Sequence, residues 1–100
     1  MTSRLIMTKG VIIGFEEMTV SLNSYPTINL CATGERIRRL RMDAGLSVRD
    51  LSQLLLLSDV QAVYKWQRGE NLPSMKNLVL LSWLLGVPMD KILVVEYHND

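Results

Sequence analysis

Apolar residues recur three or four positions apart in four stretches between residues 28 and 95, and polar caps or glycines separate these stretches. This spacing places the apolar side chains on one face of a helix. The pattern predicts helices from a start between Ile28 and Gly34 to near Ala44, from Ser47 or Val48 to about Leu55, from Val60 to about Arg68, and from the cap Ser74 to Gly86. Ser47 and Asp50 have the spacing of a capping box.

The third predicted helix, residues 60–68, buries Val63 and Trp66 on one side. Its outer side carries Gln61, Ala62, Tyr64 and Lys65. A helix this short needs support, because about 12 or more residues are required for marginal stability in water. We expect Asp59 to cap it, since an Asp side chain accepts hydrogen bonds from the free N–H groups at a helix start.

Short motifs follow one another along the chain: Ile37-Arg38-Arg39-Leu40-Arg41, Gly45-Leu46-Ser47, Leu51-Ser52, Val63-Tyr64-Lys65-Trp66, Arg68-Gly69, Leu72-Pro73-Ser74 and Leu84-Leu85-Gly86-Val87. Together they resemble the Cro/C1-type (XRE-like) helix-turn-helix family of DNA-binding regulators over about residues 30 to 95. The resemblance implies an all-α, five-helix, lambda-repressor-like DNA-binding domain with a flexible N-terminal arm. The fifth helix would start at Pro88 or Asp90 and run through Leu93.

The resemblance also implies which residues touch DNA, because the third helix of such a domain lies in the major groove. Base contacts are expected from Val60, Gln61, Ala62 and Lys65. Contacts to the DNA backbone are expected from Arg38, Arg39, Ser47, Arg49, Tyr64, Arg68 and Asn71. Taken one at a time, these polar residues are equally typical of a solvated helix face, and Arg68 is equally suited to brace the following loop.

Two features depart from the family pattern. Val48 stands where many members have a glutamine that touches a phosphate, so that contact must be absent or supplied by Ser47 or Arg49. The link at residues 56–59 is one residue longer than the commonest spacing.

The fourth predicted helix is apolar almost all round, which is typical of a buried helix. Its inward face is expected to contain Met75, Leu78, Leu81, Ser82 and Leu85, and a second stripe contains Leu80, Trp83, Leu84 and Val87. Either the ends of the same chain cover this stripe, or a second subunit or another protein does. We therefore take Leu80, Trp83 and Leu84 as a candidate dimer or partner surface.

The predicted domain spans residues 28–95, between an N-terminal arm at 1–27 and a tail at 96–100. The strand-like residues 11–13 fit a flexible arm, an untranslated upstream extension that ends before Met18, or a strand that pairs with a partner subunit. Val94, Val95 and Tyr97 favour a strand-like tail.

The 100 residues carry a net charge of +1 and 48% hydrophobic residues, as expected for one small globular domain. Residues 34–95 contain nine Lys and Arg against six Asp and Glu, a mild excess of +3 where the DNA-binding resemblance lies. Because Cys31 and His98 are single, they favour no disulfide, metal site, cofactor or catalytic set, and the chain is not expected to be an enzyme. Cys31 is expected to be buried or half-buried.

The sequence therefore predicts a cytoplasmic transcriptional regulator that binds double-stranded DNA as a homodimer. One alternative is an antitoxin-type regulator that binds a toxin through Leu80, Trp83 and Leu84. The other is a protein-interaction module that has kept the fold and lost DNA binding.

Overall fold

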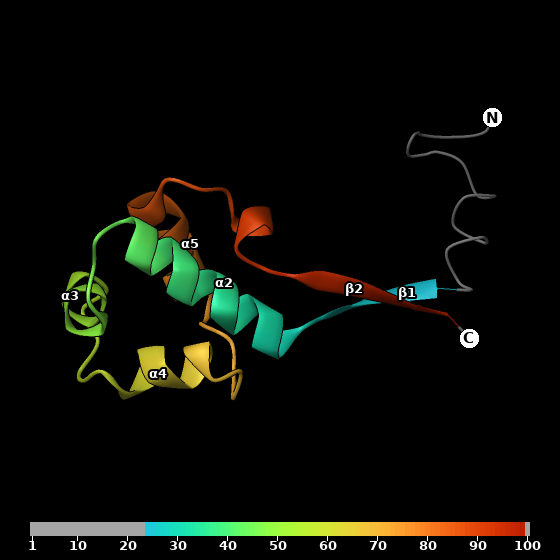
Figure 1. Cartoon of the computed structure of the whole chain (residues 1–100), viewed down its shortest axis with the longest axis horizontal. Helices are drawn as coiled ribbons and strands as arrows, with labels where there is room; N and C mark the ends of the chain where they lie inside the picture. The colour runs from blue at the N-terminus through green and yellow to red at the C-terminus, as the bar shows by residue number, and fades with distance from the viewer. Residues whose placement is uncertain (1–23, 100) are drawn as a thin grey trace. The chain divides into compact units, whose positions relative to one another are not determined.

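The structure is a computed structural model that describes residues 24–99. The elements along these residues are β1 (Ser24–Ile28), α2 (Leu30–Asp43), α3 (Val48–Leu54), α4 (Gln61–Gln67), α5 (Met75–Leu85), the 3-10 turn η2 (Met89–Lys91) and β2 (Val95–Asn99) (Figure 1). Contacts divide this part of the chain into a helical unit, Ile28–Val95, and a second unit formed by residues 24–27 and 96–99. The expectations for residues 1–23, including the strand at 11–13, lie outside the described residues.

The four predicted helices are present, and local chemistry sets their ends. The Ser47 hydroxyl accepts a hydrogen bond from the Asp50 N–H, while the Asp50 carboxylate accepts one from the Ser47 N–H, so the predicted capping box is confirmed. These hydrogen bonds lower the pKa of Asp50. Three of the four helices end at a glycine with a positive φ, which glycine adopts without strain: 74° at Gly45, 76° at Gly69 and 68° at Gly86.

The predicted lambda-repressor-like helical fold is confirmed, but the all-α class and the five helices are not. The residues described contain four α-helices, and the expected fifth helix is the single turn η2. After this turn the Val94 N–H donates to Thr33 Oγ1 at 2.9 Å, and the Val94 carbonyl accepts from the Asn29 N–H at 2.8 Å. These two bonds hold Val94 against the start of α2, so the chain continues as β2 rather than as a helix.

The strands β1 and β2 form a two-stranded sheet. The rings of Tyr25 and His98 stack with their centroids 5.4 Å apart, and Thr27 Oγ1 lies 2.7 Å from His98 Nε2. The predicted strand-like tail is thus confirmed for Val95 and Tyr97, which lie in β2. A two-stranded sheet is marginally stable alone, and these side-chain contacts add to the hydrogen bonds that join β1 and β2.

One hydrophobic core fills the helical unit. Its buried members are Ile37, Leu51, Leu55, Val63, Trp66, Leu78, Leu81 and Ile92. The prediction for Val63 and Trp66 is therefore confirmed. Two other predictions are wrong: Met75 is 68% exposed because it begins α5 beyond the core, and Cys31 is exposed in the first turn of α2.

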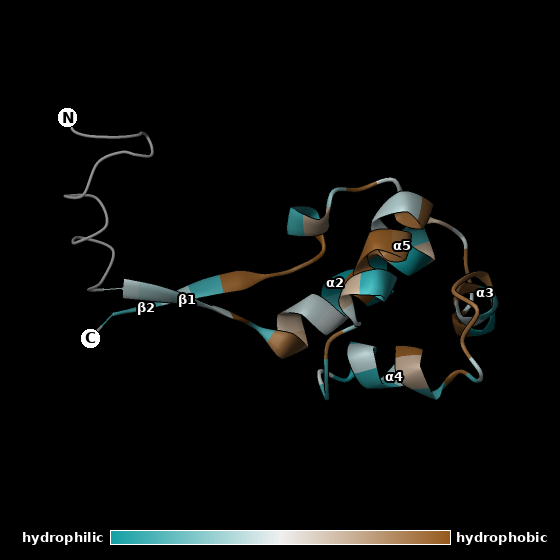
Figure 2. Ribbon diagram, turned by 180° about the vertical axis from the view of Figure 1, so that it is seen from behind, coloured by the Kyte–Doolittle hydropathy of each residue, from teal (hydrophilic) through white to brown (hydrophobic). Residues whose placement is uncertain are grey.

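The most extensive packing between helices is that of α2 and α4, which lie side by side in both views (Figures 1 and 2). A Cβ atom added to Gly34 would lie 2.1 Å from the carbonyl oxygen of Trp66 and 2.9 Å from that of Gln67. Both neighbours are backbone atoms, so no side chain can move aside to make room. Gly34 therefore fixes how closely the C-terminal half of α4 packs against α2.

The link from α3 to α4 contains a strained residue. Leu56 has a φ of 58° and is 87% exposed, although a left-handed backbone is costly for a residue with a branched side chain. Its neighbour Leu57 turns inward and packs against the core. The link thus packs Leu57 against the core, and Leu56 takes the left-handed backbone conformation that a glycine would adopt without strain.

Replacing Gly34 with alanine should destabilise the fold, although the same change normally stabilises a helix interior. Overpacking of this kind costs on the order of 1 to 3 kcal/mol, and thermal unfolding followed by circular dichroism will measure it. Gly86→Ala is the control, because open space surrounds Gly86 and only its φ of 68° opposes a side chain. An unchanged or raised melting temperature for Gly34→Ala would show that α2 and α4 are not packed this tightly.

The buried hydroxyl of Ser52 gives a second prediction. Ser52 is 3% exposed, and its Oγ has no hydrogen-bond partner among the described residues. A buried polar atom without a partner costs about 1 to 3 kcal/mol, so Ser52→Ala should stabilise the protein, with Ser58→Ala on the exposed link as the control. A lower melting temperature for Ser52→Ala in the same experiment would mean that the hydroxyl has a partner.

Candidate nucleic-acid interface

The outer face of α4 presents an amide and an ammonium group. Gln61 and Lys65 are exposed and lie one helical turn apart, whereas Val63 and Trp66 on the opposite face are buried. The Asp59 carboxylate accepts a hydrogen bond from the Gln61 N–H at 2.8 Å, so Asp59 stabilises the helix start as expected. The helix begins one residue later than predicted, at Gln61 with Val60 at its N-cap.

The other predicted base-contact residues are less accessible. Val60 and Ala62 are half-buried, and Ala62 packs against the core. Tyr64 is 41% exposed on the same helix. The exposed polar side chains of α4 that a ligand could contact are therefore those of Gln61, Tyr64 and Lys65.

Helix α3 explains the first departure from the family pattern. Val48 is half-buried and packs against the core, so this position supports the fold and offers no polar group to a phosphate. Ser47 is exposed, but its hydroxyl oxygen already accepts the capping bond from Asp50. Arg49 is exposed in the first turn of α3 and is the remaining cation there.

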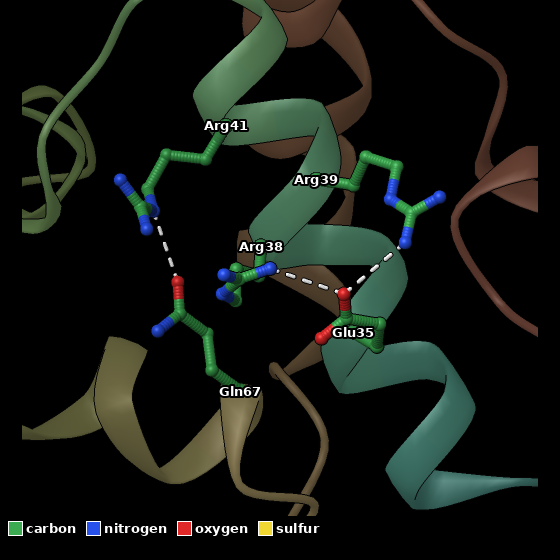
Figure 3. A network of polar contacts seen from close by, with 5 residues as sticks. All are labelled: Glu35, Arg38, Arg39, Arg41 and Gln67. Carbon is green, nitrogen blue, oxygen red and sulfur yellow. Dashed lines mark hydrogen bonds and ion pairs between the residues drawn. The ribbon is translucent and has the colours of Figure 1, made fainter.

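The arginines of α2 have two different environments, as Figure 3 shows. Arg38 and Arg39 both donate to Glu35 Oε2, at 3.1 Å and 3.3 Å, and all three side chains are exposed. Arg41 points the other way, toward α4. Its Nε donates to Gln67 Oε1 at 2.9 Å and its Nη1 to the Leu46 carbonyl at 2.7 Å.

Arg41 therefore joins three parts of the helical unit: α2, the turn before α3, and the last residue of α4. Both hydrogen bonds are partly buried. The bond to Gln67 lies at the same end of α4 as the backbone contact at Gly34. The polar contact and the close backbone packing together hold α4 against α2.

A second exposed ion pair lies just beyond α4, where Arg68 Nε donates to Glu70 Oε2 at 2.5 Å. This hydrogen bond lowers the pKa of Glu70, and the nearby charges of Arg68 and Lys65 lower it further. Glu70 is therefore ionised at neutral pH. Asn71, the next predicted backbone contact, is exposed in the same loop.

Sequence reasoning did not single out Gly34, Glu35 or Gln67, or the bridging role of Arg41, whereas the ion pair between Arg68 and Glu70 agrees with the alternative that Arg68 braces the following loop. The pairing of Glu35 had a signal, since Arg38 and Arg39 follow it by three and four residues, the spacings that meet on a helix surface. Arg41 and Gln67 are 26 residues apart and had none.

Two short helices joined by a tight link, with the second laid across the first helix of the unit, are the geometry of a helix-turn-helix domain. The chain belongs to the Helix-turn-helix family, whose model matches residues 37–92. This match confirms the predicted Cro/C1-type class, a class of DNA-binding transcription regulators that are not enzymes.

Two solved structures are similar to the chain. The restriction-modification controller protein C.AhdI from Aeromonas hydrophila is 32% identical over 63% of this chain and 94% of its own, with a TM-score of 0.57. The clp gene regulator ClgR from C. glutamicum is 23% identical over 66% of this chain and 84% of its own, with a TM-score of 0.56, and at this identity it supports the fold alone. A comparison with curated proteins gave no match.

No helix within residues 24–99 is long and apolar enough to cross a membrane. The same residues contain no group of three or more His, Cys, Asp or Glu side chains placed to hold a metal ion.

The bond between Arg41 and Gln67 predicts that Gln67→Glu will stabilise the protein. A carboxylate at this position would accept the same hydrogen bond from the Arg41 guanidinium and would add the attraction between two opposite charges. We expect a gain of about 1 kcal/mol in the free energy of unfolding by denaturant titration.

Gln53→Glu adds the same charge at an exposed position of α3 and should have little effect. Equal effects of Gln67→Glu and Gln53→Glu would show that the contact between Arg41 and Gln67 contributes nothing specific.

Proposed function

We propose that the protein is a sequence-specific transcriptional regulator that inserts α4 into the major groove of DNA. The observation that carries this proposal is the division of α4 into two faces. Val63 and Trp66 fix the helix in the core, and Gln61 and Lys65 point outward from a rigid support. Family membership supports DNA binding as the general activity.

The two outward groups suit base edges. The Gln61 amide can pair with N6 and N7 of adenine, and the Lys65 ammonium can donate to O6 or N7 of guanine or to a phosphate. Val60 and Ala62 are half-buried and apolar, so each would make at most a van der Waals contact with a thymine methyl group. Specificity would therefore depend mainly on Gln61 and Lys65.

Backbone contacts would surround α4. Arg38 and Arg39 come from α2, Ser47 and Arg49 from the start of α3, Tyr64 from α4, and Arg68 and Asn71 from the loop that follows. All seven residues are exposed. Contacts of this kind fix orientation and carry no sequence information directly.

We further propose that the protein binds as a homodimer through the outer face of α5. Trp83 is 79% exposed on this face, and Val79 and Met75 precede it by four and eight residues, so the three share one apolar row. The candidate residues Leu80 and Leu84 are half-buried against the core, so they would border the row rather than form its centre. The brown colour of α5 in Figure 2 reflects its apolar composition, in which Lys76 is the only charged residue.

A dimer would place two copies of α4 in successive major grooves, about 34 to 36 Å apart. The same exposed row also fits the alternative of an antitoxin-type regulator that binds a toxin. Activity on DNA would place the protein in the cytoplasm, the compartment predicted from its sequence.

Selection of bound duplexes from a random pool, repeated at two salt concentrations, tests the proposal. A two-fold symmetric consensus supports a dimeric, sequence-specific regulator. A consensus without two-fold symmetry would contradict the proposal that the protein binds DNA as a homodimer. Retention of no duplex at either salt concentration supports the interaction module that has lost DNA binding.

Gln61→Ala should weaken binding to the selected duplex by about 1 to 3 kcal/mol and relax base choice at one position. Arg39→Ala should weaken binding to every sequence alike and flatten the salt dependence, because a phosphate contact is independent of sequence. Fluorescence anisotropy on the selected and scrambled duplexes measures both. Equal losses on the two duplexes for Gln61→Ala would contradict its role as a base contact.

A further inference from the structure

Carboxylates hold three of the arginines assigned to the DNA backbone. Glu35 Oε2 accepts hydrogen bonds from both Arg38 and Arg39, and Glu70 Oε2 accepts one from Arg68. We propose that Glu35 and Glu70 compete with DNA phosphates for these guanidinium groups and thereby set the strength of sequence-independent binding. This inference rests on the proposed DNA-binding function.

Both carboxylates border the same end of α4. Glu35 follows Gly34, which packs against the carbonyl groups of Trp66 and Gln67 at the C-terminal end of α4, and Figure 3 shows Glu35 between Arg38 and Arg39. Arg41 reaches Gln67, the last residue of α4, and Glu70 lies three residues beyond it. At the opposite end of α4, the Asp59 carboxylate accepts a hydrogen bond from the Gln61 backbone N–H and pairs with no arginine among the described residues.

Arg38 and Arg39 can exchange their carboxylate partner, Glu35, for a phosphate. The Glu35 side chain is 49% exposed and the side chains of Arg38 and Arg39 are 45% and 68% exposed, so water reaches every member. Exposed ion pairs are weak and sensitive to salt. A DNA phosphate can therefore replace the Glu35 carboxylate as the partner of Arg38 and Arg39. The carboxylate stays nearby, however, and its negative charge repels the phosphate.

The low charge of the domain makes this competition important. Residues 34–95 carry only +3, and Glu35 and Glu70 account for two of the six acidic residues in that range. Sequence-independent binding comes almost entirely from phosphate contacts, and each contact adds about 0.9 to the slope of log K against log salt. Removing either carboxylate should therefore add about one phosphate contact to this slope.

Titration of the full chain with a scrambled duplex across a salt series tests the proposal. Glu35→Gln and Glu70→Gln should each tighten binding about threefold to tenfold at low salt and steepen the salt slope by about 0.9, with the double variant adding both effects. Asp43→Asn is the control for charge. It makes the same change at the last residue of α2, where no ion pair is found among the described residues.

A second background separates competition from general charge. In Arg38→Gln/Arg39→Gln protein, the gain from Glu35→Gln should disappear. A gain that persists without the two arginines overturns the proposal, as does equal binding by the wild type, Glu35→Gln and Asp43→Asn. If the wild type and all variants fail to bind any duplex at low salt, the proposed function itself falls and this inference with it.

Discussion

The presentation of α4 depends on the absence of a side chain at Gly34. Because nothing projects from this position, the carbonyl groups of Trp66 and Gln67 approach α2 to a distance that a single Cβ atom would prevent. A seven-residue helix cannot hold its own conformation in water. The backbone contact at Gly34, the buried Trp66 side chain and the hydrogen bond from Arg41 therefore keep α4 helical and give it one orientation.

Most of the helical framework was predictable because its determinants are local. The Ser47 and Asp50 capping box, the Ser74 cap and the three positive-φ glycines each act within a few residues, and the structure confirms them. The errors arise where distant residues decide. The strand β2 follows Val94 because Asn29 and Thr33, more than 60 residues earlier, bind the backbone of Val94. No local pattern contains that information.

The candidate site divides in the same way. Helical periodicity alone placed Val63 and Trp66 in the core and Gln61 and Lys65 outside it, and the structure agrees. The partners of the arginines were predictable only in part. Glu35 precedes Arg38 and Arg39 by three and four residues, spacings that meet on a helix surface. Arg41 had no predicted partner, and the structure shows that it ties α2 to α4, whereas Arg38 and Arg39 share a single carboxylate.

An NMR titration of the full chain with its selected duplex tests most directly whether this rigidly held helix meets DNA. The account predicts that the largest shifts fall on the Gln61 side-chain amide and on the backbone amides of residues 60–65. The indole N–H of Trp66 should shift little, because its ring stays in the core. Shifts that centre on Val79 and Trp83 of α5 and leave Gln61 unchanged would contradict the account.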